Sequence, residues 1–294
     1  MASRRRQLNN RLGTLAFRTA LRWMRGKSVA QAESAGRRLG RIAYRLDRKH
    51  RERTIANLAL AFPDESEKWH AETSVKVWEH FGLIAADFLQ TPQRTNQEVL
   101  DNMTCDGLDI YRETFALGKG VLVLGAHFGN WERLGHFTAA IGIPLTAIAR
   151  DANDSGLNDM VLDLRRQAGM EIVSRGNAAR AVLERLKKGS MVGILPDQNA
   201  GDAFIPFFGK PAGTVLGPGV LHLRSGAPVI TTYCARVGPG KYHTFIGEPL
   251  PCDGTPESVM LGMNQRLEAI IREYPEQYLW LHDRWKSARQ RGLL

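Results

Sequence analysis

Hydrophobic residues in the first hundred positions recur at steps of three and four, which is the spacing of amphipathic helices. Pro63 follows one such run and would end its helix. The predicted helices cover Leu8–Arg25, Ser28–Asp47, Lys49–Phe62 and Ser66–Leu89. In the fourth we expect one buried face, formed by Val75, Trp78, Phe81, Ala85 and Phe88.

Beyond Asn102 the pattern changes to short apolar runs, typical of buried strands, that alternate with helical periodicity. The predicted strands are Val121–Gly125, Leu145–Ala149, Met191–Leu195, Pro228–Ala235 and Tyr242–Ile246. The predicted helices are Trp131–Ile141, Asn158–Ala168, Ala178–Leu186, Val215–Arg224 and Glu257–Arg272. Alternating strands and helices predict an α/β fold with a central, largely parallel sheet flanked by helices.

The same change of pattern divides the chain into a helical, basic part, residues 1–100, and an α/β domain, residues 101–294. With 43% apolar and 24% charged residues, the 294-residue chain has ordinary globular composition. Its three cysteines are far apart and form neither a disulfide framework nor a CxxC pair. They favour a reducing, cytosol-facing location.

The basic residues are concentrated at the start of the chain. Residues 1–53 hold 16 Lys and Arg against 3 Asp and Glu, a net charge of +13, whereas the remaining 24 basic and 27 acidic residues give −3. Such an arm binds polyanions, either nucleic acid or an anionic membrane. Nucleic acid is the weaker alternative, because no zinc-finger spacing or RNP-like aromatic run accompanies the charge.

The first predicted helix favours a membrane surface. At about 100° per residue, one narrow wedge of it holds Arg11, Arg18, Arg22 and Arg25, and apolar residues including Trp23 fill most of the rest. This composition suits the lipid headgroup boundary, whereas the arginines interrupt it too often for a spanning helix. The alternative is that the helix packs on the protein with its arginines in water.

The segment Gly125–Glu132, GAHFGNWE, follows the first predicted strand, and ligands of open α/β sheets bind beyond the carboxyl ends of strands. His127 and Glu132 can meet only if His127 lies in the turn and Glu132 in the first turn of the next helix. A carboxylate on one ring nitrogen would fix the tautomer and leave the other nitrogen as a general base for an alcohol. Alternatively, His127 only binds backbone and Glu132 only complements the helix dipole.

Other catalytic motifs are missing from the sequence. It contains no GxSxG, no Walker A and no HExxH motif, so no acyl-enzyme serine is expected. His136 could join His127 in a metal site, but a third ligand at a recognisable spacing is lacking. We therefore expect neither a metal nor another cofactor.

GAHFGNWE resembles the His-x4-Asp/Glu motif of the lysophospholipid acyltransferase superfamily, and specifically of the bacterial late lipid A acyltransferases, which transfer lauroyl and myristoyl groups. Four further segments resemble that family in the same order: RTIANLALAFP (53–63), GILPDQNAGDAFIPFFG (193–209), residues 212–219 with the GAP of 226–228, and PEQYLWLHDRWK (275–286). The resemblance therefore spans about residues 50–286.

The resemblance implies transfer of a fatty acyl group from an acyl carrier protein thioester to a hydroxyl of a lipid A precursor, at the cytoplasmic face of the inner membrane. His127 would be the base and Glu132 would hold it. Candidates for oxyanion or phosphate contacts are Arg150, Arg165 and Arg166. Asp197 and Gln198 would shape or orient the site, or merely cap a loop.

Aromatic residues supply further candidates. Phe204, Phe207 and Phe208 could line an acyl-chain channel or belong to the core. Five residues near the end of the chain could contact the membrane or the carrier protein, or form a solvated face: Trp280, His282, Arg284, Trp285 and Lys286.

Several alternatives stay open for the activity. Acyl-CoA could replace acyl carrier protein as the donor. The acceptor could be another glycolipid, such as a phosphatidylinositol mannoside. The protein could also be a non-catalytic lipid-binding relative of the same fold.

Overall fold

The computed structural model describes residues 2–149, 155–174 and 178–294. The N-terminal part consists of α1 (Ala2–Met24), α2 (Val29–Leu46), α3 (Arg48–Ala61) and α4 (Glu67–Leu89). Side chains at the N-caps fix where these helices begin: Ser28 caps α2, Asp47 caps α3 and Ser66 caps α4. The predicted boundaries of α2, α3 and α4 are confirmed to within about one residue.

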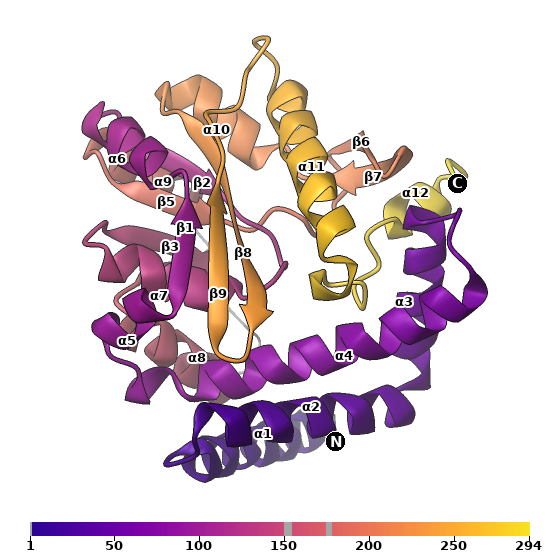
Figure 1. Ribbon diagram of the computed structural model, residues 1–294. Coiled ribbons are helices and arrows are strands. Elements are labelled where there is room, and N and C mark those ends of the chain that lie inside the picture. The colour runs from indigo at the N-terminus through magenta and orange to yellow at the C-terminus, as the bar shows by residue number, and fades with distance from the viewer. Residues whose placement is uncertain (1, 150–154, 175–177) are drawn as a thin grey trace.

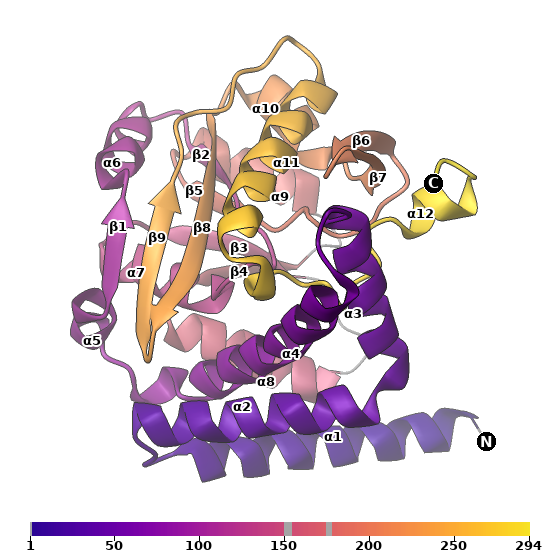
Figure 2. The same cartoon turned by 45° about the vertical axis from the view of Figure 1, so that its right-hand side comes forward.

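Helices α1 and α2 lie side by side along one end of the molecule, and α4 lies between α2 and the sheet (Figures 1 and 2). Glycines bring α2 and α4 into backbone contact. A Cβ atom at Gly36 would fall on the carbonyl oxygen of Gly82, and one at Gly40 on that of Trp78. The two helices can therefore approach only because these positions lack side chains.

Replacing Gly36 or Gly40 with alanine is expected to lower the free energy of unfolding by about 1–3 kcal/mol, because the added methyl meets backbone that cannot move aside. Urea unfolding of the purified variants measures this. Gly13→Ala in α1 is the control: open space surrounds Gly13, and the higher helix propensity of alanine should stabilise by up to about 1 kcal/mol. Equal stability of all three variants would contradict the close contact.

Placement of α4 between two layers also corrects a prediction about its buried face. Of the five residues expected to form that face, Trp78 is buried, but Ala85 is exposed and the other three are half-buried. Burial instead extends around the helix and includes Thr73, Ser74 and Val77. The periodic pattern assumed one partner surface, whereas α4 has α2 on one side and the sheet domain on the other.

The sheet has seven strands in the order β1-β9-β8-β2-β5-β3-β4. Their bounds are β1 (Met103–Asp106), β2 (Val121–Leu124), β3 (Leu145–Ala149), β4 (Glu171–Ser174), β5 (Met191–Ile194), β8 (Val229–Gly238) and β9 (Lys241–Ile246). Every neighbouring pair is parallel except the β8–β9 hairpin, so the prediction of an α/β fold with a largely parallel sheet is confirmed. The edge strands β1 and β4 were not predicted.

Helices cover both faces of this sheet. Leu122 and Leu124 of β2 face one core, which α9 (Ala178–Lys187), α10 (Gly217–Ser225) and α11 (Pro256–Glu273) help to enclose. Val121 and Val123 face the other core. The helices on that side include α5 (Asn96–Asp101), α6 (Leu108–Ala116), α7 (Trp131–Ala140) and α8 (Ser155–Gln167). Outside the sheet lie the hairpin β6 (Ala203–Phe207) and β7 (Lys210–Thr214), the 3₁₀ turns Thr91–Gln93 and Pro275–Gln277, and α12 (Lys286–Gln290).

Candidate active site

Adjacent parallel strands bring His127 and Asp197 together. Leu124 at the end of β2 pairs with Ile194 at the end of β5. His127 and Asp197 each lie three residues beyond those positions, so both side chains emerge at the carboxyl edge of the sheet. The sequence could not reveal this meeting, because 70 positions separate the two residues and strand order is a tertiary property.

Asp197 holds His127 by two contacts. Its Oδ1 lies 2.8 Å from His127 Nδ1, and its Oδ2 accepts the His127 backbone N–H at 3.0 Å. Because a carboxylate only accepts, Nδ1 carries the proton and Nε2 is the nitrogen with a free lone pair. No described residue hydrogen-bonds Nε2, and His127 lines a cavity. The imidazole is therefore arranged to accept a proton from a bound molecule.

The electrostatics of this pair follow from its burial. Asp197 is almost fully buried and His127 is partly buried. Burial opposes protonation of His127, but the charge of Asp197 and its hydrogen bond, together with the charge of Glu132, raise the pKa of His127 overall. Burial likewise opposes ionisation of Asp197, yet its contacts with His127 keep the pKa of the carboxyl below its usual value.

Glu132 does not hydrogen-bond His127, so the expectation that it orients the imidazole is corrected. Its carboxylate accepts Arg165 Nε at 2.9 Å and Nη2 at 2.6 Å, and also the indole N–H of Trp131 at 3.0 Å. Glu132 lies in the first turn of α7, where its carboxylate is directed at Arg165 of α8 rather than at the imidazole Nδ1. The ring of Trp131 meets His127 edge-on, with centroids 5.2 Å apart.

A cavity of about 660 Å³ opens beside His127. Its polar lining includes Glu132, Arg165, Gln198, Asn199 and Arg224. Much of the remaining wall is apolar and comes from the strands and from helices on both faces of the sheet: Val123, Leu134, Leu145, Met170, Val182, Leu183 and Leu221. A few polar groups in an otherwise largely apolar cavity are typical of a small-molecule binding site.

The predicted arginines have different surroundings. Arg165 lines the cavity, and its Nη1 has no partner among the described residues. Arg166 does not line the cavity; it is exposed and pairs with Asp163 on its own helix at 2.7 Å. Arg150 lies outside the described residues.

The three phenylalanines expected to line an acyl channel do not line this cavity. Phe207 and Phe208 are buried in an aromatic cluster with Tyr278, Trp280 and Trp285. Phe204 is half-buried beside the guanidinium of Arg291. Phe207 and Phe208 therefore belong to the core, as the alternative interpretation expected.

Much of the segment 275–286 also lies in the interior of the protein. Trp280, Arg284 and Trp285 are buried, so these three form neither the membrane contact nor the solvated face expected for them, whereas His282 is half-buried and Lys286 is exposed. Arg284 donates to Gly213 O and to Thr214 Oγ1 at 2.9 Å, and its guanidinium lies over the ring of Phe207. This segment fastens the β6–β7 hairpin to the core.

Four of the residues predicted to contact a membrane lie on α1, and the fifth, Arg25, directly follows it. Arg18, Arg22, Trp23 and Arg25 are exposed, and the Lys27 ammonium lies 4.3 Å from the Trp23 ring centroid. Arg11 is within α1, but its side chain is outside the described part. Among the described helices, none is both long and apolar enough to span a membrane.

Two further features follow from the described residues. They contain no group of three His, Cys, Asp or Glu side chains placed to hold a metal ion.

Sequence reasoning missed Trp131, Asn199 and Arg224 as cavity residues. Asn199 immediately follows the Asp197–Gln198 pair, which was the one available signal, whereas Arg224 belongs to a helix whose position only the fold determines.

Comparisons with known proteins show the family of this chain. A family described as bacterial lipid A biosynthesis acyltransferase matches residues 12–287. A lipid A biosynthesis palmitoleoyltransferase of Escherichia coli (strain K12) is 29% identical over 86% of this chain and 84% of its own length. A lipid A biosynthesis lauroyltransferase of the same organism is 28% identical over 85% of this chain and 83% of its own length.

A more distant relative acts on a different acceptor. A phosphatidylinositol mannoside acyltransferase of Mycobacterium tuberculosis (strain CDC 1551 / Oshkosh) is 24% identical over 70% of this chain and 68% of its own length. Since the family model matches nearly the whole chain, this protein belongs to the bacterial lipid A biosynthesis acyltransferases and is an acyltransferase.

Proposed function

We propose that this protein transfers a fatty acyl group from an acyl carrier protein thioester to a hydroxyl of a lipid A precursor, with His127 as the general base. The observation that carries the proposal is an imidazole held at Nδ1 by Asp197 whose Nε2 has a free lone pair beside a cavity with apolar walls. A base in this state suits deprotonation of a sugar hydroxyl.

The reaction follows from this arrangement. Nε2 of His127 takes the hydroxyl proton while the hydroxyl oxygen attacks the thioester carbon, forming a tetrahedral oxyanion and an imidazolium that Asp197 stabilises. Collapse of the oxyanion breaks the C–S bond, and the departing thiolate takes the proton from the imidazolium. His127 returns to its starting state, so no covalent acyl-enzyme is required.

Glu132 acts through Arg165 in this proposal. Its two hydrogen bonds fix the guanidinium at the cavity wall, with Nη1 left to contact the oxyanion or a phosphate of the acceptor. Its negative charge also favours the imidazolium form of His127. Gln198 lines the same wall and is assigned to shaping the site.

We also propose that α1 and α2 rest on the anionic cytoplasmic face of the inner membrane, as a peripheral or monotopic contact. Beyond the arginines of α1, the exposed side of α2 carries an apolar ridge, defined as Leu39, Ile42 and Leu46, which are 52%, 49% and 80% exposed. Arg38, Arg41 and Arg45 accompany this ridge on the same helix. Apolar side chains beside a cationic stripe suit an interfacial helix.

Replacing all three ridge residues with serine is expected to weaken binding to vesicles of phosphatidylethanolamine and phosphatidylglycerol by about tenfold or more, because each buried aliphatic side chain is worth about 1.5–3 kcal/mol. Vesicle co-sedimentation measures the binding. Leu117→Ser is the control, since Leu117 is also 60% exposed but follows α6, away from α1 and α2 (Figure 1). Equal loss in both variants would contradict a contact through this ridge.

The activity is tested by incubating the purified protein with lauroyl or myristoyl acyl carrier protein and an under-acylated lipid A precursor, followed by mass spectrometry of the lipid. Parallel reactions contain acyl-CoA as donor, or a phosphatidylinositol mannoside as acceptor. Transfer to the lipid A precursor that disappears in the His127→Asn variant supports the proposal. Transfer only to the mannoside would identify the mannoside, rather than the lipid A precursor, as the acceptor. No transfer to either lipid would favour a non-catalytic lipid-binding protein.

A further inference from the structure

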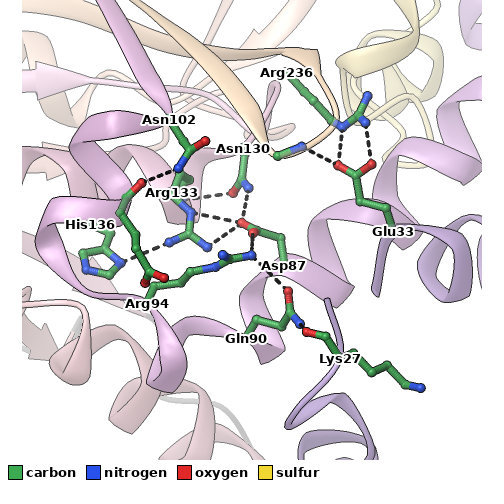
Figure 3. Close-up of polar contacts among 12 residues, drawn as sticks. Lys27, Glu33, Asp87, Gln90, Arg94, Asn102, Asn130, Arg133, His136 and Arg236 are labelled. Carbon is green, nitrogen blue, oxygen red and sulfur yellow. Dashed lines mark hydrogen bonds and ion pairs between the residues drawn. The ribbon is translucent and has the colours of Figure 1, made fainter. Parts of the chain in front are cut away.

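Helix α4, which belongs to the N-terminal part, reaches the turn that carries His127. We define the His127 turn as residues 127–130. Two side chains of α4, His80 and Asp87, lie two helical turns apart on one face and contact consecutive residues of this turn, Gly129 and Asn130. Figure 3 shows Asp87 directed at Asn130 and Arg133.

His80 contacts the backbone of the turn. Its Nε2 lies 3.1 Å from the carbonyl oxygen of Gly129. Burial, and also the charge of Arg236, lower the pKa of His80 to about 4, so the ring is neutral near pH 7. A carbonyl oxygen only accepts, so His80 donates from Nε2 and fixes the direction of that peptide group.

Asp87 contacts the side chain that starts α7. Its Oδ2 accepts Asn130 Nδ2 at 2.8 Å, and also Arg133 Nε at 3.1 Å and Nη2 at 2.7 Å. The Oδ1 of Asn130 meanwhile caps α7 by accepting the N–H of Arg133 at 3.0 Å. Arg133 is almost fully buried, and its Nη1 meets His136 Nδ1 at 3.2 Å. Asp87 therefore fixes both the cap and the first turn of α7.

Other elements also contact the turn, and Leu279 N donates to His127 O at 3.1 Å. Gly129 N donates to Gln277 O at 2.8 Å, and Asn130 N donates to Cys234 O at 2.8 Å. Gly129 has φ +57° and lies so close to Cys234 O that a Cβ atom would overlap it. The turn therefore lies against β8 and the 3₁₀ turn Pro275–Gln277. Helix α4 contacts the carbonyl oxygen of Gly129 and the side chain of Asn130, the residue that caps α7.

We propose that His80 and Asp87 are positioning residues, through which α4 holds the His127 turn in the geometry that pairs His127 with Asp197. The inference rests on the proposed role of His127 as the base. Positioning of the His127 turn would be a second role of the N-terminal helices, in addition to the proposed membrane contact. Catalysis depends steeply on such geometry, because a misplacement of about 1 Å can cost about 10²-fold in rate.

The chain supplies a matched control in Glu79. This carboxylate is also on α4 and is similarly buried. It pairs with two arginines, Arg37 at 3.1 Å and Arg41, as Asp87 does with Arg133 at 2.7 Å and Arg94 at 4.0 Å. Its partners belong to α2, and among the described residues it forms no hydrogen bond or ion pair with the His127 turn. Glu79→Gln therefore removes an ionic contact of α4 without touching the turn.

The experiment compares full-length variants. His80→Leu removes the donor to Gly129, whereas His80→Gln keeps an amide donor near the same place. Asp87→Leu combined with Arg133→Met removes both members of the most buried ion pair, while Arg94, whose Nη2 lies 4.0 Å from Asp87 Oδ1, keeps its hydrogen bond to Gln90. Thermal unfolding, kcat and KM for acyl transfer, and the NMR titration of the His127 ring are measured for each.

We expect His80→Leu and the double variant to lower kcat by about 10- to 100-fold with little change in KM, and to shift the His127 titration toward that of a histidine without its carboxylate partner. His80→Gln should recover most of kcat, and Glu79→Gln should retain both kcat and the titration. An unchanged His127 titration in His80→Leu and in the double variant would overturn the inference, whatever their stability. A shifted His127 titration with undiminished acyl transfer would support the positioning of the His127 turn by α4, but it would count against His127 as the base.

Discussion

Replacing His127 with asparagine is expected to lower kcat/KM for acyl transfer by about 10²- to 10⁴-fold, the usual contribution of a general base. The amide of asparagine can still donate to Asp197 from near the position of Nδ1, so the variant loses the proton acceptor and little else. Single-turnover transfer from acyl carrier protein, followed by mass spectrometry, measures the loss.

The control for this prediction is a second histidine–carboxylate pair. His243 Nε2 lies 3.1 Å from Asp106 Oδ2 on β9 and β1, at the far edge of the sheet. His243→Asn should keep full activity. If His127→Asn retained more than about a tenth of the activity, general base catalysis by His127 would be excluded, because such catalysis is worth at least 10²-fold.

Replacing Asp197 with asparagine is expected to have a similarly large effect, a loss in kcat on the order of 10⁴. The amide can donate to Nδ1 and thereby place the ring proton on Nε2, which is the wrong tautomer for a base. Glu132→Gln should cost less, about 10²-fold, because it weakens the hold on Arg165 but leaves the tautomer of His127 intact.

The pH dependence gives this prediction a second readout. His127 must be neutral to act as a base, so kcat/KM should fall as the pH is lowered through its pKa, which lies above the ordinary value. Without the charge of Asp197, burial dominates and the pKa of His127 falls, so the acid limb of the profile should move to lower pH. Glu132→Gln should move it in the same direction by less, because the charge of Glu132 raises the pKa of His127 less than the charge and the hydrogen bond of Asp197 do.

Asp202→Asn provides the matched control, since Asp202 lines the same cavity but, within the described part of the chain, accepts the backbone N–H of Leu216 at 3.2 Å and forms no hydrogen bond with His127. It should leave both the rate and the acid limb near their original values. A greater loss in Glu132→Gln than in Asp197→Asn would show that Glu132, rather than Asp197, supports His127 during the reaction.

The described elements show where sequence periodicity is sufficient. Strands β2, β3 and β5 are short apolar runs with turn residues on both sides, and the helices between them repeat at the helical period. Their prediction needs only local information, because each such segment can bury its apolar side in one way. The edge strands β1 and β4 and the hairpin β6–β7 lack such a pattern: Met103–Asp106 alternates buried and exposed positions over four residues.

For the site, the sequence by itself determined that His127 follows a buried strand, that Asn130 begins a helix and that the family motifs occur in order. Only the tertiary structure decided which carboxylate holds the imidazole. Glu132 is near His127 in sequence but is directed at Arg165, whereas Asp197 is distant in sequence and arrives on the adjacent strand. Hydrogen bonding depends on which strands are neighbours in the sheet, and that order comes from burying all the apolar faces at once rather than from any one segment.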